Sequence, residues 1–190
     1  MRVSVTGPAA LTSNVVELAA PEDRARRVWM PDLSLSLALV TLFWCLFIFD
    51  GGHKLFRDSD TGWHIRTGER ILATGLLPAV DPYSFTRGGA AWMDWEWGAD
   101  VVSGAVHRWA GLRGVAVLFA VTIAVCSFLW TRLTWVAGGD FLVACFFALP
   151  MLSTVNMHWL ARPHVFGWVL LVVWLLYLEC GASFSSVEAS

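Results

Sequence analysis

The segment GVAVLFAVTIAVCSFLW, residues 114–130, decides the fold class, because it runs for 17 residues without a charged side chain. A helix of this length matches the shortest that can cross the hydrocarbon core of a bilayer. Three further stretches resemble it in composition, at residues 33–49, 141–157 and 164–178. We therefore expect an all-α integral membrane protein with about four transmembrane helices.

The overall composition agrees with this class. Of the 190 residues, 57% are hydrophobic, and 12 Trp and 12 Phe stand against 13 Lys and Arg. Ordinary soluble domains are less apolar. The formal net charge of −2 lacks the positive field on which nucleic-acid binding relies, so we expect no nucleic acid among the partners.

Three regions follow from the positions of the apolar runs. Residues 1–32 are expected to be a flexible tail, residues 33–180 a single membrane domain and residues 181–190 a second, small and polar tail. The first apolar run follows a polar segment and has no small-residue cleavage site behind it, unlike a signal peptide. The four cysteines show no paired spacing and are expected to be small core residues.

The charges that flank the first span predict the topology. Arg24, Arg26 and Arg27 precede it closely, which favours a cytoplasmic N-terminus under the positive-inside rule. Residues 50–112 would then form a long outer loop, and the turn before residue 164 would lie on the same side. We expect a multi-pass membrane protein.

The outer loop is predicted to contain two interfacial helices joined by an aromatic, acidic connector. The first fits residues 60–74, with Asp60 as a candidate N-cap and Gly75 as its stop. The second fits residues 99–110, with one apolar and one polar face, and Gly111 is its natural stop. Long structured loops often carry function.

Asp58 and Asp60 are the candidate catalytic residues and also the candidate metal ligands. Two carboxylates just past a span could hold a divalent cation against a phosphate, or one could deprotonate an acceptor hydroxyl. The alternative is that they form a solvated turn, with Asp60 capping the helix. His64, which follows closely, is a candidate substrate-binding residue.

The other substrate-binding candidates lie in the connector and before the last span. Asp94 and Glu96 would point the same way on an extended chain, and the ring of Trp97 suits a sugar face or a lipid. Arg162 is suited to a phosphate, and His164 lies beside it. The alternatives are that the aromatic rings anchor the loop in the interface and that Arg162 extends to lipid headgroups.

Taken in order, these segments resemble a known family. DSDTGWHIRTGERI at residues 58–71 is followed by DPYSFT at residues 81–86 and by Glu96-Trp97, and Arg162-Pro163-His164 enters the last span. This order resembles the opening outer loop, and a second motif, of bacterial membrane glycosyltransferases of the GT-C class. The resemblance covers residues 33–178.

The resemblance implies an enzyme that transfers a sugar from a polyprenyl-phosphate carrier to an acceptor on the outer face of the bacterial cytoplasmic (inner) membrane. In that class an acidic residue of the first outer loop is the base or metal ligand, which maps here to Asp58 or Asp60. Members commonly have several hundred residues and many more spans. The alternative expectation is therefore a truncated, non-catalytic accessory subunit of a larger membrane complex, such as a respiratory or photosynthetic one, or a chain whose missing spans come from other membrane protein subunits.

Overall fold

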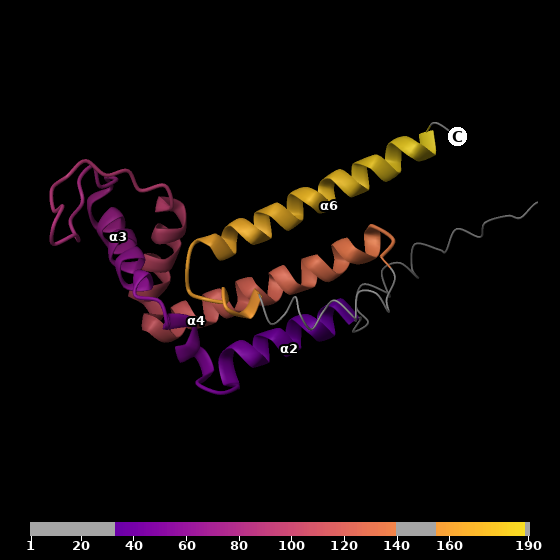
Figure 1. Cartoon of the computed structure of the whole chain (residues 1–190), viewed down its shortest axis with the longest axis horizontal. Helices are drawn as coiled ribbons and strands as arrows, with labels where there is room; N and C mark the ends of the chain where they lie inside the picture. Colours follow the sequence, from indigo (N-terminus) through magenta and orange to yellow (C-terminus); the bar gives the residue numbers. More distant parts are fainter. Residues whose placement is uncertain (1–32, 140–154, 189–190) are drawn as a thin grey trace, which may run out of the picture. The chain divides into compact units, whose positions relative to one another are not determined.

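A computed structural model describes residues 33–139 and 155–188, and this part of the chain is helical without strands (Figure 1). The predicted tail 1–32 and almost all of the predicted third span, 141–157, lie outside the described residues. The elements are α2 (Leu33–Phe47), the short 3-10 helix η1 (Gly51–Phe56), α3 (Asp60–Thr74), α4 (Trp97–Val136) and α6 (His164–Glu188). The expected all-α class is confirmed for the described chain.

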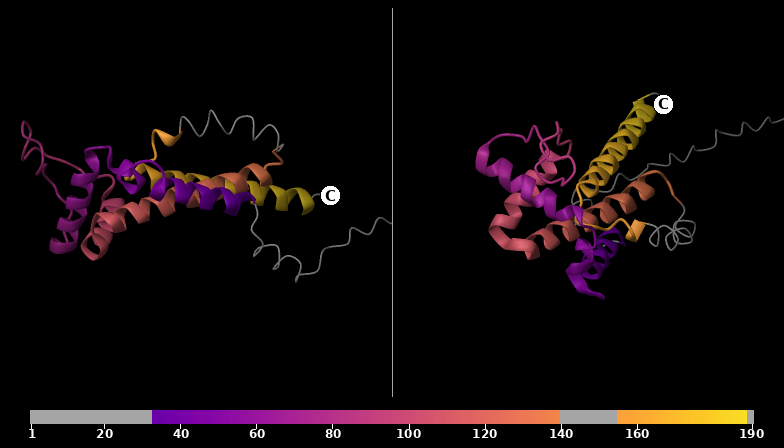
Figure 2. Two further views of the ribbon diagram at one scale, coloured as in Figure 1. Left: turned by 90° about the horizontal axis from the view of Figure 1, so that it is seen from below. Right: turned by 60° about the vertical axis from the view of Figure 1, so that its left-hand side comes forward.

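Three apolar helical segments run side by side: α2, the later part of α4 and α6 (Figures 1 and 2). Side chains from all three, from η1 and from the turn before α6 form one core. The buried members of that core are Cys45, Leu55, Ile65, Val115, Ala116, Phe119, Ala120, Ile123, Trp159, Ala161 and Val165. Most of the core lies where η1 and the turn before α6 meet α4, and therefore close to the acidic residues singled out in the sequence.

One described helix, α4, is long and apolar enough to cross a membrane. α2 and the part His164–Glu179 of α6 are apolar but shorter. α2 ends at Phe47, two residues before the predicted end of the first span, and Phe49 has a positive φ of 55°. α6 instead continues to Glu188, past the predicted end at residue 178, because the sequence there holds no proline to break it. The number of four spans stays a prediction.

The first predicted loop helix is confirmed with the same bounds. α3 ends at Gly75, whose φ of 70° is left-handed and whose N–H donates to the carbonyl of Ile71 at 2.8 Å. At the start of the helix, Asp60 is not the cap that the sequence suggested. The Asp58 carboxylate instead accepts the N–H of Asp60 at 2.9 Å, which leaves the Asp60 side chain free for another partner.

The second predicted loop helix is continuous with the span that follows it. α4 contains a break at Gly111, with φ 64° and ψ −163°, where the sequence predicted a stop. We call residues 97–110 the first arm and residues 112–136 the second arm, and Figure 1 shows the bend between them. Only glycine adopts these angles readily, so Gly111 turns the chain from α3 into the apolar bundle.

The first arm has the two faces that the sequence predicted. Its polar face, with Asp100, Ser103 and Gly104, is buried, and α3 packs against the first arm (Figure 2). Its apolar face is open in part, where Val102 is 43% and Trp109 is 87% exposed. An exposed apolar face with a tryptophan is typical of a helix that lies at a membrane surface.

Candidate functional site

The crossing of α3 over the first arm places the acidic residues, and two glycines set how closely the helices approach. A Cβ on Gly68 would lie 1.7 Å from the carbonyl oxygen of Asp100, and a Cβ on Gly104 would lie 2.5 Å from the nitrogen of Glu69. No other residue fits either position without a shift of the backbone. The close approach brings the inner face of α3 against Asp100.

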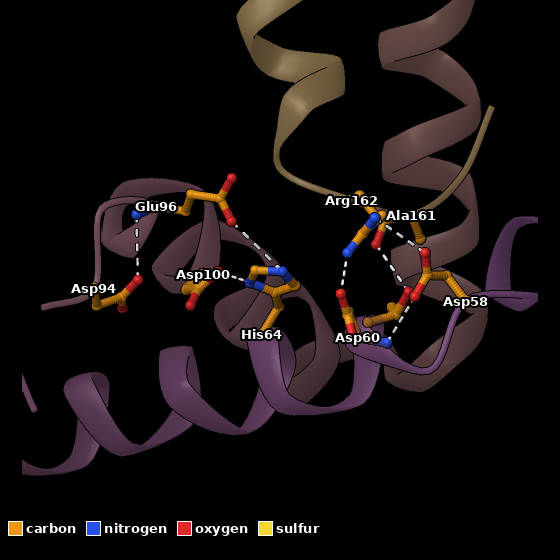
Figure 3. A network of polar contacts seen from close by, with 9 residues as sticks. Asp58, Asp60, His64, Asp94, Glu96, Asp100, Ala161 and Arg162 are labelled. Atoms are coloured by element: carbon orange, nitrogen blue, oxygen red, sulfur yellow. Dashed lines mark hydrogen bonds and ion pairs between the residues drawn. The ribbon is translucent and has the colours of Figure 1, made fainter. Parts of the chain in front are cut away.

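Arg162 joins the two carboxylates of the DSD segment (Figure 3). One guanidinium nitrogen lies 3.1 Å from Asp58 Oδ2, and the other forms an ion pair with Asp60 Oδ2. All three side chains are between one fifth and two fifths exposed, so the cluster is open to one side. We call Asp58, Asp60 and Arg162 the arginine cluster.

Backbone contacts hold the arginine cluster together. The N–H of Ala161 donates to the carbonyl of Leu55 at 2.8 Å, and the Thr61 hydroxyl donates to the carbonyl of Ala161 at 3.0 Å. Leu55, Thr61 and Ala161 are buried. The turn before α6 is therefore tied to η1 and to the start of α3, which positions Arg162 beside the acids.

A second polar group lies one helical turn further along α3. His64 is buried, with only 4% of its side chain exposed, and its Nδ1 lies 2.7 Å from Asp100 Oδ1. Its Nε2 lies 3.6 Å from Glu96 Oε2 (Figure 3). We call His64, Asp94, Glu96 and Asp100 the histidine cluster.

The acids of the histidine cluster differ in their surroundings. The side chain of Asp100 is fully buried, and burial raises its pKa from the ordinary 3.8 to about 6, against the lowering effect of the His64 hydrogen bond. Asp94 is 7% exposed and Glu96 is 48% exposed. One carboxylate oxygen of Asp94 and one of Asp100 are buried without a hydrogen-bond partner.

An aromatic group lies along α3 next to His64. The rings of Trp63, Tyr83 and Trp92 lie 5.7 to 6.3 Å apart, and Trp63 also stacks on His64 at 3.6 Å. The Tyr83 hydroxyl is 2.9 Å from that of Thr67, which ties the connector to the helix. The connector is thus held over the histidine cluster.

The structure brings together six of the eight predicted site residues and leaves two apart. Asp58, Asp60 and Arg162 share one cluster, and His64, Asp94 and Glu96 share the other. Among the described contacts, none joins Trp97 to either cluster, although it begins α4 beside Glu96. His164 contacts His158 and Trp168 instead.

The expectation that Asp94 and Glu96 point the same way is wrong. The chain turns between them, and the N–H of Glu96 donates to Asp94 Oδ1 at 3.2 Å. A turn breaks the alternation that an extended strand would impose. Asp94 therefore faces the interior, whereas Glu96 reaches from the surface toward His64.

The residues present do not form a divalent-metal site as they are arranged. Within the described part of the chain, no three His, Cys, Asp or Glu side chains are grouped so that they could hold a metal ion. Asp58 and Asp60 both turn to the guanidinium of Arg162, a cation that takes the place a metal ion would need. The metal expectation stays a prediction.

Sequence reasoning missed Asp100, which it assigned only to the polar face of a surface helix. The signal that could have identified it is Gly104, one turn later on that face, together with Gly68 on α3. Small residues on two facing stripes allow two helices to approach closely, and a polar side chain beside them is then buried.

Comparison with known proteins gave no relative. No protein-family model, no curated protein and no solved structure matches this chain.

Proposed function

We propose that this chain is a GT-C glycosyltransferase-like membrane module that handles a sugar carried on polyprenyl phosphate at the outer face of the bacterial inner membrane. The observation that carries the proposal is the arginine cluster: Arg162 lies against Asp58 and Asp60, which are about one hundred residues away in the sequence. These are the residues that the family resemblance singles out. Their convergence is what a shared site requires.

Within this proposal Arg162 is the phosphate-binding residue. A guanidinium presents paired N–H donors that match the oxygens of a phosphate. Because Arg162 is about one third exposed, a phosphate can approach it from the open side and compete with the two carboxylates. Asp58 and Asp60 hold the guanidinium in place until then.

The reaction needs charge stabilisation at two points. An acceptor oxygen must lose its proton as it attacks the sugar carbon, and negative charge builds on the departing phosphate. Arg162 is the group that would stabilise the charge on the phosphate. The acidic residues and His64 along the inner face of α3 are the groups available for the first.

The membrane setting rests on α4 and on the exposed apolar side chains. α4 is long and apolar enough to cross a bilayer, and large side chains such as Phe47, Trp109 and Leu170 are more than 60% exposed. Lipid in contact with these faces would remove them from water at no cost. We propose a multi-pass protein with a cytoplasmic N-terminus, which puts both clusters on the outer side.

A second candidate function is a non-catalytic accessory subunit of a larger membrane complex. The specific observation in its favour is that both acids of the DSD segment are already paired with Arg162. Groups paired internally are expected of a structural role. In that case the exposed apolar faces would pack on other membrane subunits.

Binding of undecaprenyl phosphate separates the two candidates. The full chain, purified in a mild detergent, is incubated with this lipid and examined by native mass spectrometry. We expect one lipid retained per chain, and at least tenfold weaker retention for Arg162→Ala.

The matched control is Arg57→Ala, which removes an arginine from a nearby pair with Asp50 that is more than 60% exposed. Retention by this variant should equal that of the wild type. The transferase proposal is wrong if the wild type retains no lipid, or if both variants lose the lipid equally. Either result would support the accessory-subunit function.

A further inference from the structure

His64 lies close to the arginine cluster and faces the same way. It follows Asp60 by four residues on α3, so the two side chains share a face about 6 Å apart along the helix axis. Figure 3 shows the two clusters next to each other along α3. A molecule whose phosphate contacts Arg162 therefore has its neighbouring atoms near His64.

We infer that His64 takes the proton of the acceptor hydroxyl in the proposed transfer, and that Asp100 is the residue that positions the His64 ring. This inference rests on the proposed function and refines it. The family resemblance implies Asp58 or Asp60 for this task, but both carboxylates are engaged with Arg162.

The geometry around the ring supports this role. Asp100 occupies the Nδ1 side at 2.7 Å, and an ionised carboxylate there accepts a hydrogen bond from Nδ1–H. The basic lone pair is then on Nε2. Among the described residues, the charged group recorded next to Nε2 is Glu96 at 3.6 Å, which is beyond hydrogen-bonding distance. Nε2 is thus held in one orientation with no hydrogen bond of its own.

Acidic side chains surround the ring on which such a step places a proton. Asp100 and Glu96 flank it, Asp94 lies behind Asp100, and from the side of α6 the arginine cluster carries two acids against one guanidinium. A carboxylate next to a histidine stabilises the imidazolium and fixes its tautomer, as in the serine-protease triad. Asp100 has that place here.

The acceptor hydroxyl gives its proton to His64 Nε2, and its oxygen forms a bond to the anomeric carbon of the sugar. The bond from that carbon to the phosphate oxygen breaks, and its electron pair stays on the phosphate beside Arg162. The proton then leaves His64 through Glu96, whose side chain is 48% exposed.

Two buried oxygens point to the chemical class of the acceptor. Asp94 and Asp100 each hold one carboxylate oxygen without a partner. A buried acceptor left unpaired is costly, and a donor is expected to satisfy it. A polyhydroxylated acceptor such as a sugar carries O–H donors, and the aromatic rings of Trp63 and Trp92 next to the cluster suit its apolar face.

The test is the reactivity of His64 toward diethyl pyrocarbonate, which acylates only unprotonated imidazole nitrogen. The full chain in detergent is treated between pH 5 and 8, with and without undecaprenyl phosphate, and peptide mass spectrometry follows each histidine separately. We expect His64 to react despite its burial, with a rate that rises with pH. For Asp100→Asn the pH–rate curve should move to lower pH by about one unit or more, because the neighbouring negative charge is gone.

The control uses a second histidine–carboxylate pair from the described part of the chain. His107 Nδ1 lies 2.6 Å from Glu69 Oε1. Glu69→Gln should move the curve of His107 and leave that of His64 unchanged. The inference is wrong if His64 stays inert at every pH, with and without the lipid. It is also wrong if Asp100→Asn leaves the pH–rate curve of His64 unchanged. If the wild type retains the lipid but His64 is inert, only this inference is wrong. If the wild type does not retain the lipid, the proposed function is wrong.

Discussion

Gly68 of α3 lies directly on the backbone of Asp100 in α4, so closely that a Cβ on Gly68 would come within 1.7 Å of the Asp100 carbonyl oxygen. The same approach brings His64 Nδ1 to 2.7 Å from the Asp100 carboxylate, because His64 stands one turn before Gly68 on the same face. The missing side chain at residue 68 therefore allows the buried hydrogen bond between His64 and Asp100.

Gly68→Ala should destabilise the crossing of α3 and α4. The clash is with backbone, which cannot move aside as a flexible side chain would, so we expect a loss of about 1–3 kcal/mol or more. Thermal unfolding of the purified chain in detergent measures it. Gly62→Ala is the matched control on the same helix, since a Cβ there meets nothing within 4 Å. Equal melting temperatures for the two variants would contradict the close crossing.

The burial of Asp100 predicts a pH dependence of stability. Its pKa is raised from 3.8 to about 6, so the folded chain binds this proton more tightly than the unfolded chain does. The stability it contributes is complete below about pH 4 and is lost as the pH rises through 6. The difference between a pKa of 3.8 and one of about 6 changes the free energy of unfolding by about 3 kcal/mol.

Asp100→Asn should remove this pH dependence. The variant cannot ionise, so the difference between its free energy of unfolding and that of the wild type should grow between about pH 4 and pH 6 and then level off. Unfolding curves at a series of pH values measure that difference. A constant difference across the range would show that Asp100 is not held in a raised-pKa environment.

The arginine cluster predicts a measurable coupling between α3 and the turn before α6. A double-mutant cycle with Asp60→Asn and Arg162→Gln should give a coupling free energy of about 0.5–1 kcal/mol, because the pair is partly exposed and solvent screens it. The cycle with Asp50→Asn and Arg57→Gln is the control. That pair is more than 60% exposed on both sides, and its coupling should be close to zero. Equal couplings would mean that the arginine cluster is not a defined contact.

The proposed topology predicts which side of the membrane each exposed turn faces. In a chain without native cysteines, Ser59→Cys and Ser84→Cys should react with a membrane-impermeant maleimide added outside intact cells. Both residues are exposed, so the protein itself does not shield them. Ala137→Cys, at the opposite end of α4, should react only after permeabilisation. Labelling of all three from one side would rule out a crossing by α4.

Local signals in the sequence were sufficient for the helices of the loop. A glycine at residue 75 that adopts φ 70° ends α3, and Gly111 breaks α4, because glycine adopts positive φ most readily and no distant residue is needed to impose it. Apolar runs in the sequence likewise predicted α2, the second arm and α6. The sequence alone therefore determined the helical class and the positions of its breaks.

Only the tertiary structure decided which polar residues meet. Arg162 and Asp60 are 102 residues apart, and nothing near either of them specifies the other. Asp100 looked like a surface residue until the glycines at 68 and 104 brought two helices together over it. Contacts of this kind depend on the shapes of both partners at once, so one chain segment cannot reveal them, whereas caps and breaks depend only on the φ and ψ angles of a few neighbours.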